Sequence, residues 1–212
     1  MNSTMDAKKM RVMLWRMFGG AVVGGVASLL FFKFVGEPNM DLKNPSVLVA
    51  AGCGVVYLLI GLMVAFGVAA PKTGAHFLNV EDAEELREER PKLRTSALAT
   101  ILIGIFLLAL AMAGNAISNE IALAIAALCL LAVVAVTVAG AKQYDELTWQ
   151  LTREASAYGF YATLVFFGGW AALAHLGFVA WVSPLAFVAL LIALQLLTAF
   201  IAVGKRGMLM PR

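Results

Sequence analysis

Side chains that carry chemistry or crosslink a fold are scarce in this sequence of 212 residues, which has two cysteines and two histidines. Cys53 and Cys129 lie inside apolar runs, and neither belongs to a Cys-x-x-C or a Cys/His pattern. Because isolated cysteines of this kind are typical core residues, the spacing predicts neither a disulfide framework nor a zinc site. His76 and His175 are predicted at opposite sides of a membrane, which also argues against a shared metal site.

Charge is scarce as well, at 14% of the residues, whereas 62% of the residues are hydrophobic. Soluble proteins average roughly 45–50% apolar and about 25% charged residues, so the composition predicts a membrane protein. The net charge of +3 is spread among short segments without a continuous basic stripe and does not predict nucleic-acid binding. The centres of the long apolar runs lack Asp, Glu, Lys and Arg, which argues against an ion path or a voltage sensor.

Long uncharged runs recur along the chain, and a transmembrane helix needs about 20 apolar residues. The run from 155 to 204 is too long for one crossing, and Gly177, Ser183 and Pro184 predict a turn within it. The first run is bracketed by Arg16 and Lys33, whose long side chains reach the headgroups. The sequence therefore predicts an all-α bundle with six spans, near 13–35, 47–70, 95–117, 120–141, 155–177 and 184–204.

Lysine and arginine are distributed unevenly between the two sides of these spans. With the N-terminus inside, all of them except Lys33 and Lys43 lie on the inner side. Because cytoplasmic loops are rich in Lys and Arg, both termini of a single transmembrane domain, 1–212, are expected in the cytoplasm. Cleavage of the first span as a signal peptide is the alternative, but its apolar run continues through 29–32, beyond the small-residue sequence GVAS.

The two largest polar segments, 71–94 and 142–154, are predicted to be cytoplasmic. The first contains a short acidic helix over 79–90, with Asn79 as its N-cap and Pro91 as its end. Both segments are interpreted either as solvated faces or as a docking surface for a basic partner. The docking residues in the second case are Asp82, Glu84, Glu85, Glu88, Glu89, Asp145, Glu146, Arg153 and Glu154.

Small residues form stripes on the first two predicted spans. Gly20, Gly24 and Ser28 share one face of the first helix, and Gly54 and Gly61 lie on the second. Small residues let membrane helices approach closely, so these faces predict helix packing, either within the chain or between chains.

Gln195 is the deepest strong hydrogen-bonding group in the predicted spans. Together with Tyr158 and Tyr161 it is either an intramembrane substrate contact or a source of cross-helix hydrogen bonds.

A short motif resembles a pattern in small uncharacterised bacterial integral membrane proteins, over roughly 120–204. That pattern has an Asp-Glu-Leu element followed by a Glu-Ala-x-Ala helix start, and Thr148, Trp149 and Gln150 stand where basic residues are expected. The resemblance implies a bacterial inner-membrane location and no activity. The residues that carry it are Asp145, Glu146, Leu147, Leu151, Glu154, Ala155, Ala157, Phe160, Ala162 and Thr163.

No acid–base pair, nucleophile set or metal cluster converges in the sequence, so we expect neither an enzyme nor a cofactor. The favoured interpretation is a non-enzymatic accessory or assembly subunit of a membrane complex, in contact with lipid and with a membrane-protein partner or further copies of itself. The alternative is a small transporter or channel for an uncharged or apolar solute, using Gln195 and the tyrosines.

Overall fold

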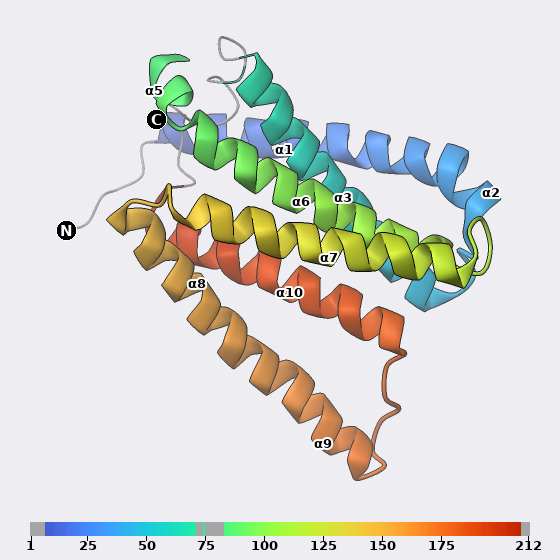
Figure 1. Ribbon diagram of the computed structural model, residues 1–212. Helices are drawn as coiled ribbons and strands as arrows, with labels where there is room; N and C mark the ends of the chain where they lie inside the picture. Colours follow the sequence, from blue (N-terminus) through green and yellow to red (C-terminus); the bar gives the residue numbers. More distant parts are fainter. Residues whose placement is uncertain (1–6, 71–73, 75–82, 209–212) are drawn as a thin grey trace.

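The computed structural model describes residues 7–70, 74 and 83–208, and over these residues the chain is helical without β-strands (Figure 1). Six helical stretches are long and apolar enough to cross a membrane, as the sequence predicted. Two of them contain a short π-helical segment, η1 (Phe32–Gly36) and η2 (Leu164–Gly168). The other elements are α1 (Ala7–Phe31), α2 (Glu37–Asn39), α3 (Pro45–Ala69), α5 (Ala83–Glu88), α6 (Arg90–Met112), α7 (Asn119–Ala141), α8 (Glu146–Thr163), α9 (Gly169–His175) and α10 (Pro184–Lys205).

Polar side chains fix where four of the helices begin, by accepting a hydrogen bond from an otherwise unpaired backbone N–H. Asn44 caps α3, Ser118 caps α7, Asp145 caps α8 and Ser183 caps α10. The predicted turn before Pro184 is confirmed, because Ser183 is the N-cap of α10 and Gly177 has a positive φ of 79°.

Pro91 was predicted to end the short acidic helix, and it lies instead in the first turn of α6. Proline suits that position because its missing N–H would have no partner in the first turn of a helix. The third span therefore begins at Arg90 rather than at 95, and it ends at Met112 rather than at 117. The short helix α5 covers Ala83–Glu88, and its predicted cap Asn79 lies outside the described residues.

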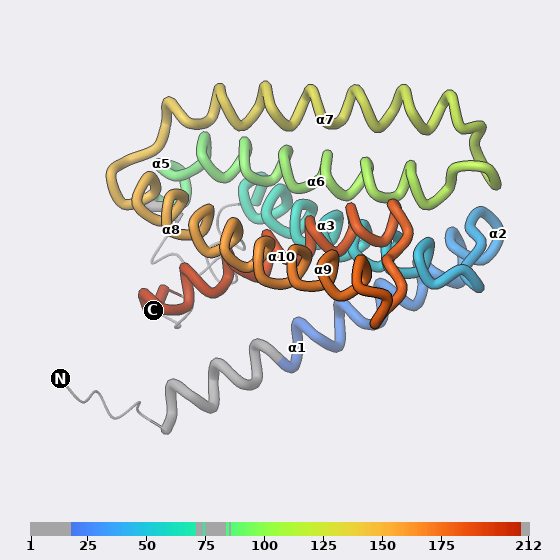
Figure 2. The backbone as a smooth tube through the Cα atoms, turned by 90° about the horizontal axis from the view of Figure 1, so that it is seen from below, coloured from blue at the N-terminus to red at the C-terminus, as the bar shows by residue number. Residues whose placement is uncertain are grey.

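The arrangement of the helices centres on α3 and α6. Helix α7 packs on α6, α10 packs on α3, and α8 packs on α10, whereas α1 lies at the edge (Figure 2). In the most apolar stretch of each helix, 39% of the residues are buried in α3 and in α6, and 17% are buried in α7 and in α10. In the most apolar stretch of the first span, no residue is buried. The outer helices therefore expose most of their side chains to whatever surrounds the bundle.

Glycines allow α3 and α6 to pack backbone against backbone. A Cβ at Gly104 would lie 2.7 Å from Leu58 Cγ and 2.9 Å from the carbonyl oxygen of Gly54. A Cβ at Gly61 would lie 2.6 Å from Ile101 Cγ1. Such close contact maximises van der Waals packing, which is the main attraction between helices in lipid.

Candidate functional site

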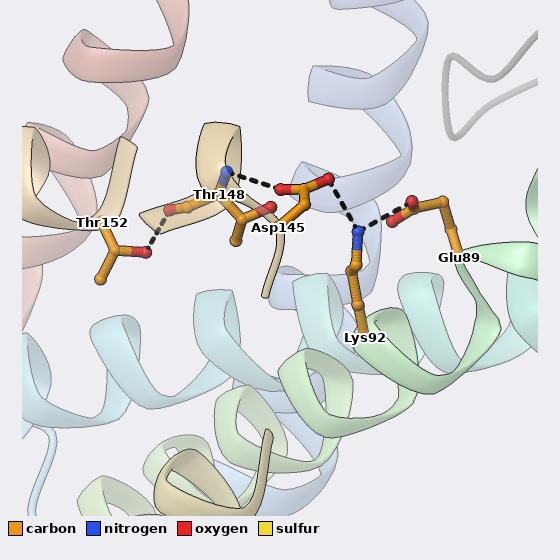
Figure 3. Close-up of polar contacts among 5 residues, drawn as sticks. All are labelled: Glu89, Lys92, Asp145, Thr148 and Thr152. Atoms are coloured by element: carbon orange, nitrogen blue, oxygen red, sulfur yellow. Dashed lines mark hydrogen bonds and ion pairs between the residues drawn. The ribbon is translucent and has the colours of Figure 1, made fainter. Parts of the chain in front are cut away.

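The two predicted cytoplasmic segments meet at one ion-pair cluster between α6 and the start of α8 (Figure 3). Lys92 Nζ lies 3.0 Å from Glu89 Oε1 and 3.1 Å from Asp145 Oδ2. The Lys92 side chain is 22% exposed and that of Asp145 is 57% exposed. The cluster thus lies at the surface, at the end of the bundle that also carries α5 (Figure 1).

Asp145 joins this ion pair to the first turn of α8. Its Oδ1 accepts a 2.8 Å hydrogen bond from the backbone N–H of Thr148, and Thr152 Oγ1 donates to the Thr148 carbonyl one turn later. Hydrogen bonds from the Thr148 hydroxyl and backbone N–H, and then from Lys92, lower the pKa of Asp145 to about 2. The carboxylate therefore stays ionised at physiological pH and serves as both cap and ion-pair partner.

A second polar cluster joins α8 to the end of α10. Arg206 Nη2 lies 2.9 Å from Glu154 Oε2, and Tyr158 donates a 2.8 Å hydrogen bond to Glu154 Oε1. Lys205 Nζ donates to the Tyr158 hydroxyl and lies 4.4 Å from the centre of its ring. Tyr158 is thus part of an ion-pair network at a helix end.

Gln195 contributes to the packing of α10 against α8. Its Nε2 donates a 3.2 Å hydrogen bond to Thr163 Oγ1, and its amide lies where a Cβ on Gly159 would have to be. Tyr161 does not join Gln195, because its side chain is 64% exposed on another face of α8. The structure thus separates the three residues that the sequence grouped as intramembrane polar contacts.

The remaining docking candidates are more dispersed. Glu146 accepts a hydrogen bond from Gln150 one turn along α8, Arg153 lies 5.7 Å from the centre of the Trp149 ring, and Glu88 is exposed on α5. Glu84 also lies on α5. The side chain of Glu85, and all of Asp82, lie outside the described residues.

The small-residue stripes differ in what they contact. Gly54 and Gly61 lie in the α3–α6 contact, whereas nothing within 4 Å would meet a Cβ on Gly20 or Gly24. Ser28 is half-buried on the same helix as these two open glycines.

Several residues that organise these contacts were not predicted from the sequence. Lys92 directly follows the predicted acidic helix, and its ion-pair partner Asp145 lies 53 positions away in the sequence. Gly104 and Gly159 are isolated glycines inside apolar runs, and that isolation is the signal that marks a close approach between helices. Thr163 was named only for the resemblance motif, and nothing in the sequence pairs it with Gln195.

In both polar clusters the charged side chains pair with one another. No group of three or more His, Cys, Asp and Glu side chains that suits a metal ion occurs in the described part of the chain. No family model, curated protein or solved structure matches the chain. By their length and apolar composition, the six helical stretches indicate a multi-pass α-helical membrane protein.

Proposed function

We propose that the protein is a non-enzymatic accessory or assembly subunit that binds a larger complex in a bacterial inner membrane. The open glycine face of α1 is the observation that carries this proposal. Gly20 and Gly24 lie one turn apart, and nothing in the described chain would meet a Cβ on either. By contrast, the glycines of the α3–α6 contact pack closely against the neighbouring helix of the same chain. A small-residue face without a neighbour within the chain suits a helix supplied by another protein.

The position of α1 supports the same proposal. This helix lies along the edge of the bundle, and none of the residues in its most apolar stretch is buried (Figure 2). A helix from a partner has access to the glycine face without displacing a helix of this chain.

The distribution of charge supports an orientation with both termini in the cytoplasm. The ends of α5, α6, α7, α8 and α10 near the Lys92–Asp145 cluster carry seven further Lys and Arg residues in the sequence, whereas Lys33 belongs to η1 and Lys43 precedes α3, next to α2 at the opposite end of the bundle (Figure 1). Cytoplasmic loops attract this excess of cations. The seven residues are Arg87, Arg90, Arg94, Lys142, Arg153, Lys205 and Arg206.

The cytoplasmic end also offers acidic side chains to a basic partner. Glu88 and Glu146 are exposed on the two segments that Lys92 brings together, so the docking surface proposed from the sequence gains a common scaffold. The resemblance of 145–163 to bacterial membrane proteins supports the inner-membrane location.

The alternative of a small transporter gains less support. Gln195, its main candidate for a solute contact, donates a hydrogen bond to Thr163 and packs on Gly159. The amide therefore has a structural role between the two helices. A solute path through the bundle would have to break this contact between α8 and α10.

The test compares two double variants of α1 during purification from native membranes in a mild detergent. Gly20→Leu with Gly24→Leu fills the open face and should remove stoichiometric partners. Gly19→Leu with Gly25→Leu is the matched control, because these glycines also have open space around them but lie off that face. The control should retain the partners.

Two results would contradict the proposal. Purification of the wild-type protein as a lone monodisperse oligomer would favour transport over a subunit role. Equal retention of partners by both double variants would show that the glycine face of α1 is not the contact.

A further inference from the structure

We propose that a cavity between the end of α3 and the start of α6 binds the headgroup of an anionic phospholipid. The cavity has a volume of about 250 Å³. Two arginines and a wall of apolar side chains form its lining, which includes Arg90, Arg94, Ala65, Ala69, Leu98 and Ile101. This inference is independent of the partner proposed for α1.

The two arginines give the cavity its positive charge. Arg90 and Arg94 are four residues apart on α6 and therefore lie on the same face of the helix. The Nε of Arg90 is buried and has no hydrogen-bond partner among the described residues. The guanidinium groups of the two lining arginines suit a phosphate, because arginine donates paired, charge-assisted hydrogen bonds to phosphate oxygens.

Lys92, the other cation at this end of α6, already forms ion pairs within the chain. Lys92 pairs with Glu89 and Asp145 on the side toward α8. Glu89 therefore pairs with Lys92, and the positive charge of the cavity comes from Arg90 and Arg94.

The size and the apolar wall favour a lipid over a free anion. A volume of about 250 Å³ is below the roughly 300–1,000 Å³ of pockets that enclose a whole small molecule. It suits a headgroup whose tails continue outside. Leu98, 47% exposed, and Ile101 follow the arginines along α6 in the direction of the bilayer, where an acyl chain would lie. Basic pockets between helices at the cytoplasmic side commonly hold such lipids.

The test measures lipid binding to the full-length protein by native mass spectrometry in detergent, with dioleoyl phosphatidylglycerol as the anionic lipid and dioleoyl phosphatidylcholine as the zwitterionic one. Wild type should bind the anionic lipid at least about tenfold more tightly. Arg90→Gln with Arg94→Gln should weaken this binding about tenfold or more, since two charged hydrogen-bond donors are lost. Equal affinity for both lipids, or unchanged binding by the double variant, would overturn the inference.

Two controls separate charge from position and from folding. Arg87→Gln with Arg153→Gln removes the same charge from exposed sites outside the cavity and should bind the anionic lipid within about twofold of wild type. A tenfold loss in this control would show general charge attraction and would overturn the site. Ala69→Trp keeps every charge and fills the cavity from an exposed position, so it should also lose binding. Wild-type binding by this variant would contradict the assignment.

A final arm distinguishes the source of the phosphate. Inorganic phosphate at the concentration of the lipid should leave lipid binding unchanged, because it lacks the acyl contacts. Displacement of the lipid at equal concentration would show a free-anion site and overturn the lipid assignment.

Discussion

Lys92 and Asp145 are 53 positions apart in the chain, and their side chains form an ion pair with an N–O distance of 3.1 Å. This pair connects the first turn of α6 to the residue that caps α8. Since α6 packs at the centre of the bundle and α8 at its edge, the pair ties a peripheral helix to the central one.

The two partners of this pair should contribute unequally to stability. Lys92→Met removes a surface ion pair, which is worth little, so the melting temperature should fall by less than about 2 °C. Asp145→Ala also removes the N-cap of α8 and should lower the melting temperature more, by about 2–4 °C. Asp145→Asn keeps a capping side chain and should fall between them. Thermal unfolding in detergent checks this order, and a larger loss for Lys92→Met would contradict it.

The same carboxyl group should make stability depend on pH in the acid range. The folded pKa of Asp145 is about 2, below its ordinary value of 3.8, so the carboxylate stabilises the fold above about pH 4. This contribution should be lost as the pH falls from about 4 to 2. The difference in melting temperature between wild type and Asp145→Asn should shrink across that window. A difference that is constant from pH 5 to pH 2 would contradict the role of the ionised group.

The α3–α6 contact should reverse the usual effect of replacing a helical glycine. Glycine to alanine in a helix gains about 1 kcal/mol of helix propensity. At Gly104, however, the new Cβ would lie 2.9 Å from the Gly54 carbonyl oxygen, so Gly104→Ala should destabilise by about 1–3 kcal/mol.

Gly52→Ala is the matched control for this prediction, because nothing within 4 Å would meet its Cβ on α3. It should be neutral or stabilising. Unfolding in a mixed-detergent titration measures both variants, and equal effects at Gly104 and Gly52 would show that α3 and α6 do not pack this closely.

The hydrogen bond between Gln195 and Thr163 should couple α10 to α8. Gln195→Leu and Thr163→Val should each cost about 1 kcal/mol or less, and the double variant should show a coupling of about 0.6 kcal/mol. The coupling comes from a double-mutant cycle of unfolding free energies. Additive effects would indicate that the two side chains act separately.

The proposed orientation predicts which introduced cysteines are accessible from outside an intact cell. In a background with Cys53 and Cys129 replaced by serine, Asn115→Cys in the α6–α7 turn should react with a membrane-impermeant maleimide. Lys142→Cys, beyond the end of α7, should react only after the membrane is permeabilised. The opposite pattern would place the termini outside and would remove the basis of the cytoplasmic docking surface.

The sequence predicted the six long apolar helical stretches, and it placed the ends of 47–70, 120–141 and 184–204 within two residues, because these features depend on neighbours along the chain. Ser183 and Pro184 mark the start of α10, and capping and proline geometry act within one turn. Pro91 shows the limit of such local signals. A proline can follow the end of one helix or lie in the first turn of the next, and the local sequence does not distinguish the two when the helices follow each other directly.

The sequence by itself determined that the chain is a bundle of apolar helices, since hydrophobicity and span length are sums over consecutive residues. Only the tertiary structure decided which helices touch. In lipid every apolar helix face is already in an apolar environment, so the hydrophobic effect does not favour one pair of helices over another. Close packing at small side chains and a few polar contacts decide which helices pair. For this reason Gly54 packs against Gly104, and Lys92 forms an ion pair with Asp145. Gly20 and Gly24 on α1 have no neighbour in the described chain that a Cβ would meet.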